Sequence, residues 1–144
     1  RSTPAVSSAA MCIRDRNKIM TDEEKELLDK IKKYKRIVNK NSLALIGNVY
    51  YELYAKTGKN EYLNDAVLNL KSSISLSNSS LDSQDAITLL LTSKCLYLLK
   101  DDISANEFCN RALSLESSLT SIVDQKEFNF LKEDCLKLGL IKGE

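Results

Sequence analysis

Apolar residues recur at the spacing of an α-helix along most of the chain, and this pattern determines the expected fold class. They come three or four positions apart in six successive segments, and no credible strand pattern lies between them. The only proline is Pro4, so none of the six segments is interrupted by proline. The sequence therefore predicts an all-α fold. The predicted helices cover residues 22–38, 42–56, 61–76, 82 or 83 to 99, 103–115, and 121 or 124 to 138.

Residues that begin and end helices stand at the borders of these segments. Thr21 followed by Glu24 is the pattern of a capping box at the start of the first helix. Gly58 is placed to end the second helix, and Asn60 to cap the third. Gly139 directly follows the last predicted helix, so we expect the helix to stop there.

The sequence lacks the residues that most familiar enzyme mechanisms need. It contains no histidine, which excludes His-based catalysis and His-ligated metal sites. Its four cysteines form no CxxC pair, and its four glycines form no phosphate-binding loop. Adjacent acidic residues point in different directions on a helix, which is poor geometry for acid/base chemistry. We therefore expect no catalytic residue, no cofactor and no metal site.

Cysteine usage and segment length bear on the compartment. The sequence shows neither a disulfide framework nor an apolar signal-peptide core, so we expect buried, reduced thiols and a cytoplasmic location. The longest apolar run extends from Ala86 to Leu91 and is interrupted by Thr88. It is far shorter than the roughly 20 residues that a membrane-spanning helix needs. We therefore expect no transmembrane segment.

The first sixteen residues differ from the remainder of the chain. Residues 1–16 hold the only proline and show no hydrophobic periodicity. We interpret them as a non-native or disordered leader, and we expect one helical domain over residues 17–144. A transit peptide is the competing interpretation, because the segment carries Ser and Arg with a single acidic residue. Met20 followed directly by a helix start argues against it.

The sequence contains a weak internal repeat, which is seen when it is aligned with itself at two different shifts. A shift of 46 residues aligns Gly47 with Ser93, and a shift of 39 aligns Ala66 with Ala105, so that small residues coincide. Small residues at a helix crossing let two antiparallel helices approach closely. The pattern predicts two helix-turn-helix units in tandem.

These two units resemble tetratricopeptide repeats, in a degenerate form that covers about residues 41–117. The first unit is longer than the family's usual length of about 34 residues, and Ser93 replaces the glycine in the second. The resemblance implies a fragment of an α-solenoid with about six helices, capped by the helices at residues 22–38 and 124–138. The matching residues are Leu43, Ile46, Gly47, Tyr50, Ala66, Ser73 and Ile74 in the first unit and Ala105, Ala112, Leu113 and Leu115 in the second.

A binding groove is what the resemblance implies about function. In tetratricopeptide arrays the first helix of each unit lines a concave groove that binds a peptide or a helix. On these two first helices, the positions that do not belong to the predicted core include Asn48, Tyr51, Lys94 and Tyr97, so the resemblance implies that these four residues line the groove. The implied function is a non-catalytic protein-protein interaction module with a protein or peptide partner.

Two alternatives concern this groove. Both tyrosines could be residues at the edge of the core with their hydroxyls in water. The helix at residues 82–99 is apolar nearly all round, which is typical of a central, buried helix. Either the groove beside it is open to a ligand, or the last helix of the chain fills it. The residues expected to fill it are Phe128, Phe130, Leu131 and Leu138.

Basic residues on the first predicted helix support a second hypothesis. Lys32, Lys33 and Arg36 supply the positive charge that phosphates or anionic lipids need. The chain would then be an adaptor to nucleic acid or to an anionic membrane surface. Acidic residues on the same helix and a formal net charge of only +1 make this partner class less favoured than a protein.

Overall fold

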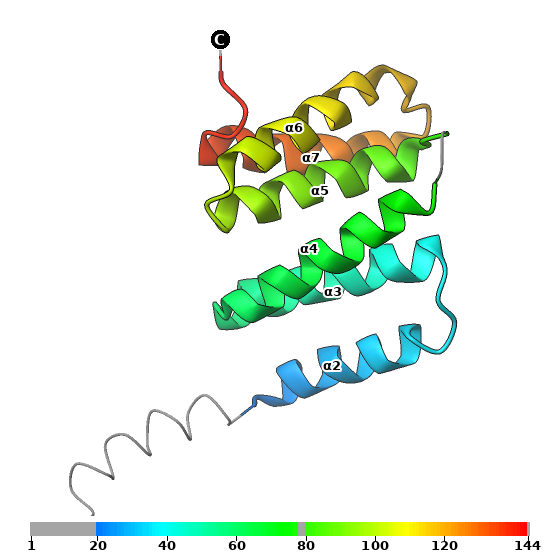
Figure 1. The fold of residues 1–144 in the computed structure, drawn as a ribbon, viewed down its shortest axis with the longest axis vertical. Coiled ribbons are helices and arrows are strands. Elements are labelled where there is room, and N and C mark those ends of the chain that lie inside the picture. The colour runs from blue at the N-terminus through cyan, green and yellow to red at the C-terminus, as the bar shows by residue number, and fades with distance from the viewer. Residues whose placement is uncertain (1–19, 78–79, 144) are drawn as a thin grey trace, which may run out of the picture.

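The computed structural model describes residues 20–77 and 80–143, and these residues form an all-α fold (Figure 1). Six α-helices and one short 3-10 helix account for the secondary structure of this part, which confirms the predicted fold class and number of helices. The interpretation of residues 1–16 concerns residues outside the described part. The helices are α2 (Asp22–Tyr34), α3 (Lys40–Thr57), α4 (Asn60–Ser75), α5 (Ser83–Leu98), α6 (Asp102–Ser114) and α7 (Ile122–Leu138), with η1 (Glu116–Ser118) between the last two.

The first helix ends one turn earlier than its apolar pattern predicts. Helix α2 stops at Tyr34, and Val38, the last residue of the predicted helix, is 65% exposed. The reason is the capping box of α3, in which the Asn39 side chain accepts a hydrogen bond from the Ser42 amide and the Ser42 hydroxyl accepts one from the Asn39 amide. This cap holds Asn39 in an extended conformation, which a continuous helix cannot contain.

Half of the predicted capping box at α2 is confirmed. The Thr21 side chain accepts a hydrogen bond of 3.0 Å from the Glu24 amide. The buried Glu24 carboxylate instead accepts hydrogen bonds from Lys59 Nζ at 3.0 Å and the Tyr62 hydroxyl at 2.6 Å, which tie α2 to the start of α4. Burial acts to raise the pKa of Glu24, but the hydrogen bonds from Tyr62 and Lys59 outweigh it and hold the pKa below its usual value.

The predicted glycine stops are confirmed, whereas one predicted cap is wrong. Gly58 and Gly139 follow α3 and α7 in the left-handed conformation, with φ of +72° and +88°. Other residues adopt this conformation at a cost, so glycine ends these helices cleanly. Asn60 is the first residue of α4, and the capping position belongs to Lys59, whose side chain makes no capping hydrogen bond.

The helices lie across the long axis of the molecule and are stacked on one another along it (Figure 1). Helix α2 packs on α3, α3 on α4, and α4 on α5, while α5 also contacts α6 and α7. Every residue of α5 from Asp85 to Leu96 is buried, which confirms the prediction for a helix that is apolar nearly all round. No helix of the described residues has both the length and the apolar character needed to span a membrane.

Helices α3 and α4 approach each other closely at Gly47. A Cβ atom built on Gly47 would lie 2.5 Å from Cγ and 2.6 Å from Cδ2 of Leu70, and 3.3 Å from the carbonyl oxygen of Ala66. Leu70 is completely buried, and in a close-packed core its side chain can move only by displacing its neighbours. The hairpins α3–α4 and α5–α6 correspond to the two predicted helix-turn-helix units.

Candidate functional site

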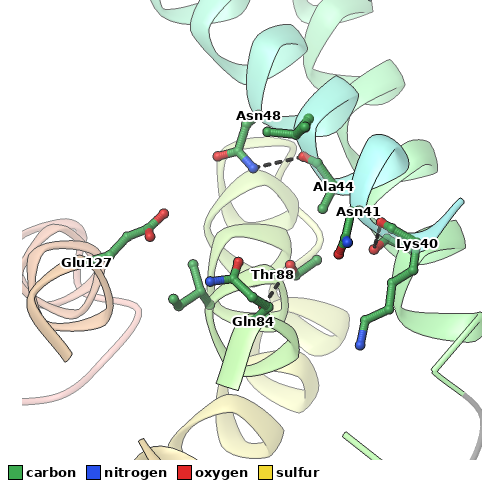
Figure 2. A pocket seen from close by; sticks show the side chains of 10 residues that line it. Lys40, Asn41, Ala44, Asn48, Gln84, Thr88 and Glu127 are labelled. Carbon is green, nitrogen blue, oxygen red and sulfur yellow. Dashed lines mark hydrogen bonds between the residues drawn. The ribbon is translucent and has the colours of Figure 1, made fainter. Parts of the chain in front are cut away.

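An open groove of about 500 Å³ lies where α3, α5 and α7 face one another (Figure 2). Residues near the N-termini of these helices contact each other, and so do residues near their C-termini, which means that the three helices run in the same direction. We call this opening the α3/α5/α7 groove. It is lined by Lys40, Asn41, Ala44, Leu45, Asn48, Ser73, Gln84, Ile87, Thr88 and Glu127.

Helix α3 forms one wall of the groove, and its groove-facing side chains are mostly accessible. Asn41, Ala44 and Asn48 follow each other at helical spacing, and both asparagines are exposed. The Asn48 amide nitrogen donates a hydrogen bond of 2.8 Å to the Ala44 carbonyl oxygen. Leu45, on the same wall, is 46% exposed. This wall therefore presents amide groups beside an apolar side chain.

Helix α5 forms the floor, and α7 forms the far wall. Ile87 and Thr88 are buried in the floor, and the Thr88 hydroxyl donates to the Gln84 carbonyl oxygen. Figure 2 shows Glu127 on α7 to one side of α5 and Lys40 and Asn41 of α3 to the other side in this view. Partial burial raises the pKa of Glu127, and the neighbouring Asp124 carboxylate adds to this shift.

A charged network anchors the N-terminal end of the groove. Lys40 Nζ lies 2.8 Å from a carboxylate oxygen of Asp85 and 3.0 Å from one of Asp82. Asp85 is buried and also accepts a hydrogen bond from the Ser77 hydroxyl. Burial acts to lower the pKa of Lys40, but its hydrogen bonds to Asp85 and Asp82 outweigh this effect and raise it. The network joins the start of α3 to the start of α5.

Lys94 links the same three helices toward their C-terminal ends, outside the lining of the groove. Its ammonium group lies 4.8 Å from the ring centre of Tyr51 on α3 and 3.0 Å from the Asp134 carboxylate on α7. Lys94 is only 8% exposed. Burial acts to lower its pKa, but the interactions with Tyr51 and Asp134 outweigh burial and raise it. Lys94 is therefore a charged link between three helices.

The four predicted site residues lie in different surroundings in the structure. Asn48 lies in the groove and is exposed. Tyr51 and Lys94 are in contact with each other and do not line the groove. Tyr97 is half-buried against the core, and its hydroxyl lies 3.6 Å from a Cβ built on Gly139, at the end of α7. Only Asn48 of the four therefore lines the open part.

Further groove residues were not predicted from the sequence. Asn41 continues the spacing of Ala44 and Asn48 by one turn, so helical periodicity could have identified it. Glu127 could not be identified in this way, because its position depends on how α7 packs against α5.

Helix α7 covers one side of α5 without filling the groove. Phe128 is completely buried and Leu131 is half-buried against the core. Phe130 and Leu138 are 68% and 36% exposed, so the hypothesis that these two residues fill the groove is wrong. Of the predicted groove, α7 covers the part at Lys94, through Asp134, and its end lies beside Tyr97, whereas the part at Asn48 is open.

The alternative basic residues lie on α2 and in the turn after it. Lys32, Lys33 and Arg36 are all exposed. Within the described ranges 20–77 and 80–143, none of the three forms an ion pair. Lys32 borders a smaller pocket, which Lys33 and Arg36 do not line.

The described cysteines are buried thiols. Cys95, Cys109 and Cys135 are free and inaccessible. Burial raises the pKa of both Cys95 and Cys135 to about 12, which keeps these thiols protonated and unreactive at neutral pH. Among the residues that the structure covers, no group of three or more Cys, Asp and Glu side chains is arranged to hold a metal ion.

Comparison of the chain with protein-family models, with curated protein sequences and with solved structures gives no match in any of the three.

Proposed function

We propose that the chain is a non-catalytic protein-protein interaction module that binds a peptide or a helix of its partner in the α3/α5/α7 groove. The observation that carries this proposal is the opening itself, which is about 500 Å³ and is lined mainly by side chains of α3, α5 and α7, with the exposed ones on α3 and at Gln84 and Glu127. A stack of helical hairpins with a groove along its first helices is the arrangement that a tetratricopeptide-like array would use.

The chemistry of the groove suits a peptide. The amides of Asn41, Asn48 and Gln84 can donate and accept hydrogen bonds, as a peptide main chain or polar side chain requires. Leu45 offers an exposed apolar contact on the same wall. Interfaces typically combine such an apolar contact with a surrounding polar rim. The groove therefore supports both affinity and orientation of a bound segment.

Contacts between the helices near both of their ends support a preformed site. Lys94 holds Tyr51 of α3 and Asp134 of α7 at fixed positions, and Lys40 ties the other end of α3 to Asp85 of α5. A groove whose walls are already fixed loses less conformational entropy when a ligand binds. We assign Tyr51 and Lys94 this positioning role, and we assign partner contact to Asn48 and its neighbours.

Quantitative affinity capture from the source cell tests the proposal. Leu45→Lys places a charge in the groove, and Leu68→Lys places the same charge on the outer face of α4, where Leu68 is 66% exposed. We expect a partner that the wild-type chain enriches to be lost with Leu45→Lys and kept with Leu68→Lys. Equal enrichment by both variants would contradict binding in the groove.

A second candidate function is an adaptor to nucleic acid or to an anionic membrane surface. It is favoured by Lys32, Lys33 and Arg36, which are exposed and without an ion pair inside the described part of the chain. Phosphate binding of this kind falls steeply as salt increases, whereas groove binding of a peptide depends less on salt. Binding of duplex DNA or of phosphatidylserine vesicles at two salt concentrations separates the two functions.

We also propose a cytoplasmic location. The three described cysteines are free thiols, which fits a reducing compartment.

A further inference from the structure

A second, smaller pocket of about 260 Å³ lies on α2, beside α3 and separate from the α3/α5/α7 groove. Helix α2 packs on α3, and this pocket occupies part of the remaining surface of α2. Its volume is below the range of about 300–1,000 Å³ that is typical of small-molecule sites. The pocket is therefore better suited to one inserted side chain than to a cofactor.

Three lysines form the rim of this pocket. Lys25, Lys32 and Lys35 are exposed, and the one carboxylate that lines the pocket with them belongs to Asp29. None of the three lysines forms an ion pair with any residue in the ranges 20–77 and 80–143. The lining of the pocket therefore carries three ammonium groups against one carboxylate, which leaves it with an excess of positive charge.

The floor of the pocket is apolar. Leu28 and Tyr50 are half-buried there, and Met20 is 37% exposed at its edge. The Tyr50 ring stacks on Tyr62 with ring centres 6.2 Å apart, which holds it in place. An apolar floor inside a basic rim is complementary to a ligand that is apolar at its centre and acidic around it.

We propose that this pocket docks an acidic amphipathic helix of a protein partner. One apolar side chain of that helix enters the pocket against Leu28 and Tyr50, and carboxylates one turn away on the same helix reach the rim lysines. Carboxylate-ammonium contacts around a shielded apolar anchor give both orientation and affinity. The site is distinct from the α3/α5/α7 groove and does not depend on it.

Other occupants fit these observations less well. Nucleic-acid phosphates and lipid headgroups pair with the rim but leave the apolar floor without a partner. Residues 1–19 of this chain carry four basic residues against one acidic residue, so their charge repels the lysine rim. Charge and apolar character together favour an acidic protein segment.

The test measures binding of a synthetic peptide to the full chain by calorimetry. The peptide contains Leu at every third or fourth position and Glu elsewhere, and a scrambled peptide of the same composition has no apolar face. The pocket variant carries Lys25→Gln, Lys32→Gln and Lys35→Gln. The matched control carries Lys30→Gln, Lys33→Gln and Arg36→Gln, which remove the same charge from positions of the same segment that do not line the pocket.

We expect the pocket variant to bind the amphipathic peptide about tenfold more weakly than the wild type, and the control variant to remain within about threefold. Met20→Ser, which changes a residue outside the helices, should also weaken binding and provides a readout that is independent of charge. Equal losses in both triple variants, or equal binding of the scrambled peptide, would overturn the proposal. So would failure of the full chain to bind the peptide, or tighter, pocket-dependent binding of duplex DNA or anionic vesicles.

Discussion

Replacing Gly47 by alanine tests how closely α3 and α4 approach each other. The added Cβ would lie 2.5 Å and 2.6 Å from two carbon atoms of Leu70, well inside van der Waals contact. Leu70 is completely buried, so relieving the overlap requires movement of the helices or of the core. Overpacking of this kind costs about 1–3 kcal/mol. The higher helix propensity of alanine returns about 1 kcal/mol.

The net expectation for Gly47→Ala is a loss of up to about 2 kcal/mol in the free energy of unfolding. Gly47→Leu adds three more carbon atoms to the same space and should cost about 3 kcal/mol or more. Urea denaturation followed by circular dichroism measures both values. Asn48→Ala is the control, because its exposed side chain bonds only to the carbonyl of its own helix, and it should change stability by less than about 0.5 kcal/mol.

A double-mutant cycle with Leu70→Ala isolates the contact. Leu70→Ala alone should cost about 2–5 kcal/mol, because it leaves a cavity in the core. The methyl group of alanine at position 47 then enters vacated space, so the double variant should lose about 0.5–3 kcal/mol less than the sum of the single losses. A Gly47→Ala variant about 1 kcal/mol more stable than the wild type, with additive effects in the cycle, would refute the close approach.

Three further predictions concern the charged links and the start of the chain. Glu24→Gln should lower the free energy of unfolding by about 1–3 kcal/mol at neutral pH. Because the folded pKa of Glu24 is below its unfolded value, its contribution is complete above the unfolded pKa and is lost as pH falls through the folded pKa. Parallel pH-stability curves for variant and wild type would argue against this role. Lys94→Met should cost about 1–3 kcal/mol by leaving Asp134 unpaired, and adding Asp134→Leu should recover most of the loss in thermal unfolding. Removing residues 1–16 should leave the midpoint of thermal unfolding unchanged, and a fall of several degrees would show that the segment is structural.

Local sequence signals predicted most of the secondary structure. The helical spacing of apolar residues identified six helices, and Gly58 and Gly139 marked two of their ends. The pattern failed at Val38, where spacing alone suggested another helical turn. The capping box of Asn39 and Ser42 determines the helix border at this point. It stabilises the start of α3 by more than one exposed valine would stabilise a longer α2.

The candidate site was less predictable, because it depends on which helices meet. Lys94 is the only charged residue between Asp85 and Lys100, and a lone charge in an apolar helix is a signal for a buried ion pair. Its partner Asp134 carries no such signal, since forty residues separate the two and only the packing of α7 brings them together. Glu127 in the α7 wall of the groove could not be predicted for the same reason, because only the packing of α7 brings it to the groove.

The most direct measurement of groove binding is an NMR titration of the full chain with the segment of a captured partner. The groove predicts the largest changes in backbone amide signals at Asn41, Leu45 and Asn48 of α3 and at Gln84 of α5. Changes confined to α2 and the turn after it, with the α3 signals unmoved, would contradict the α3/α5/α7 groove as the site of partner binding.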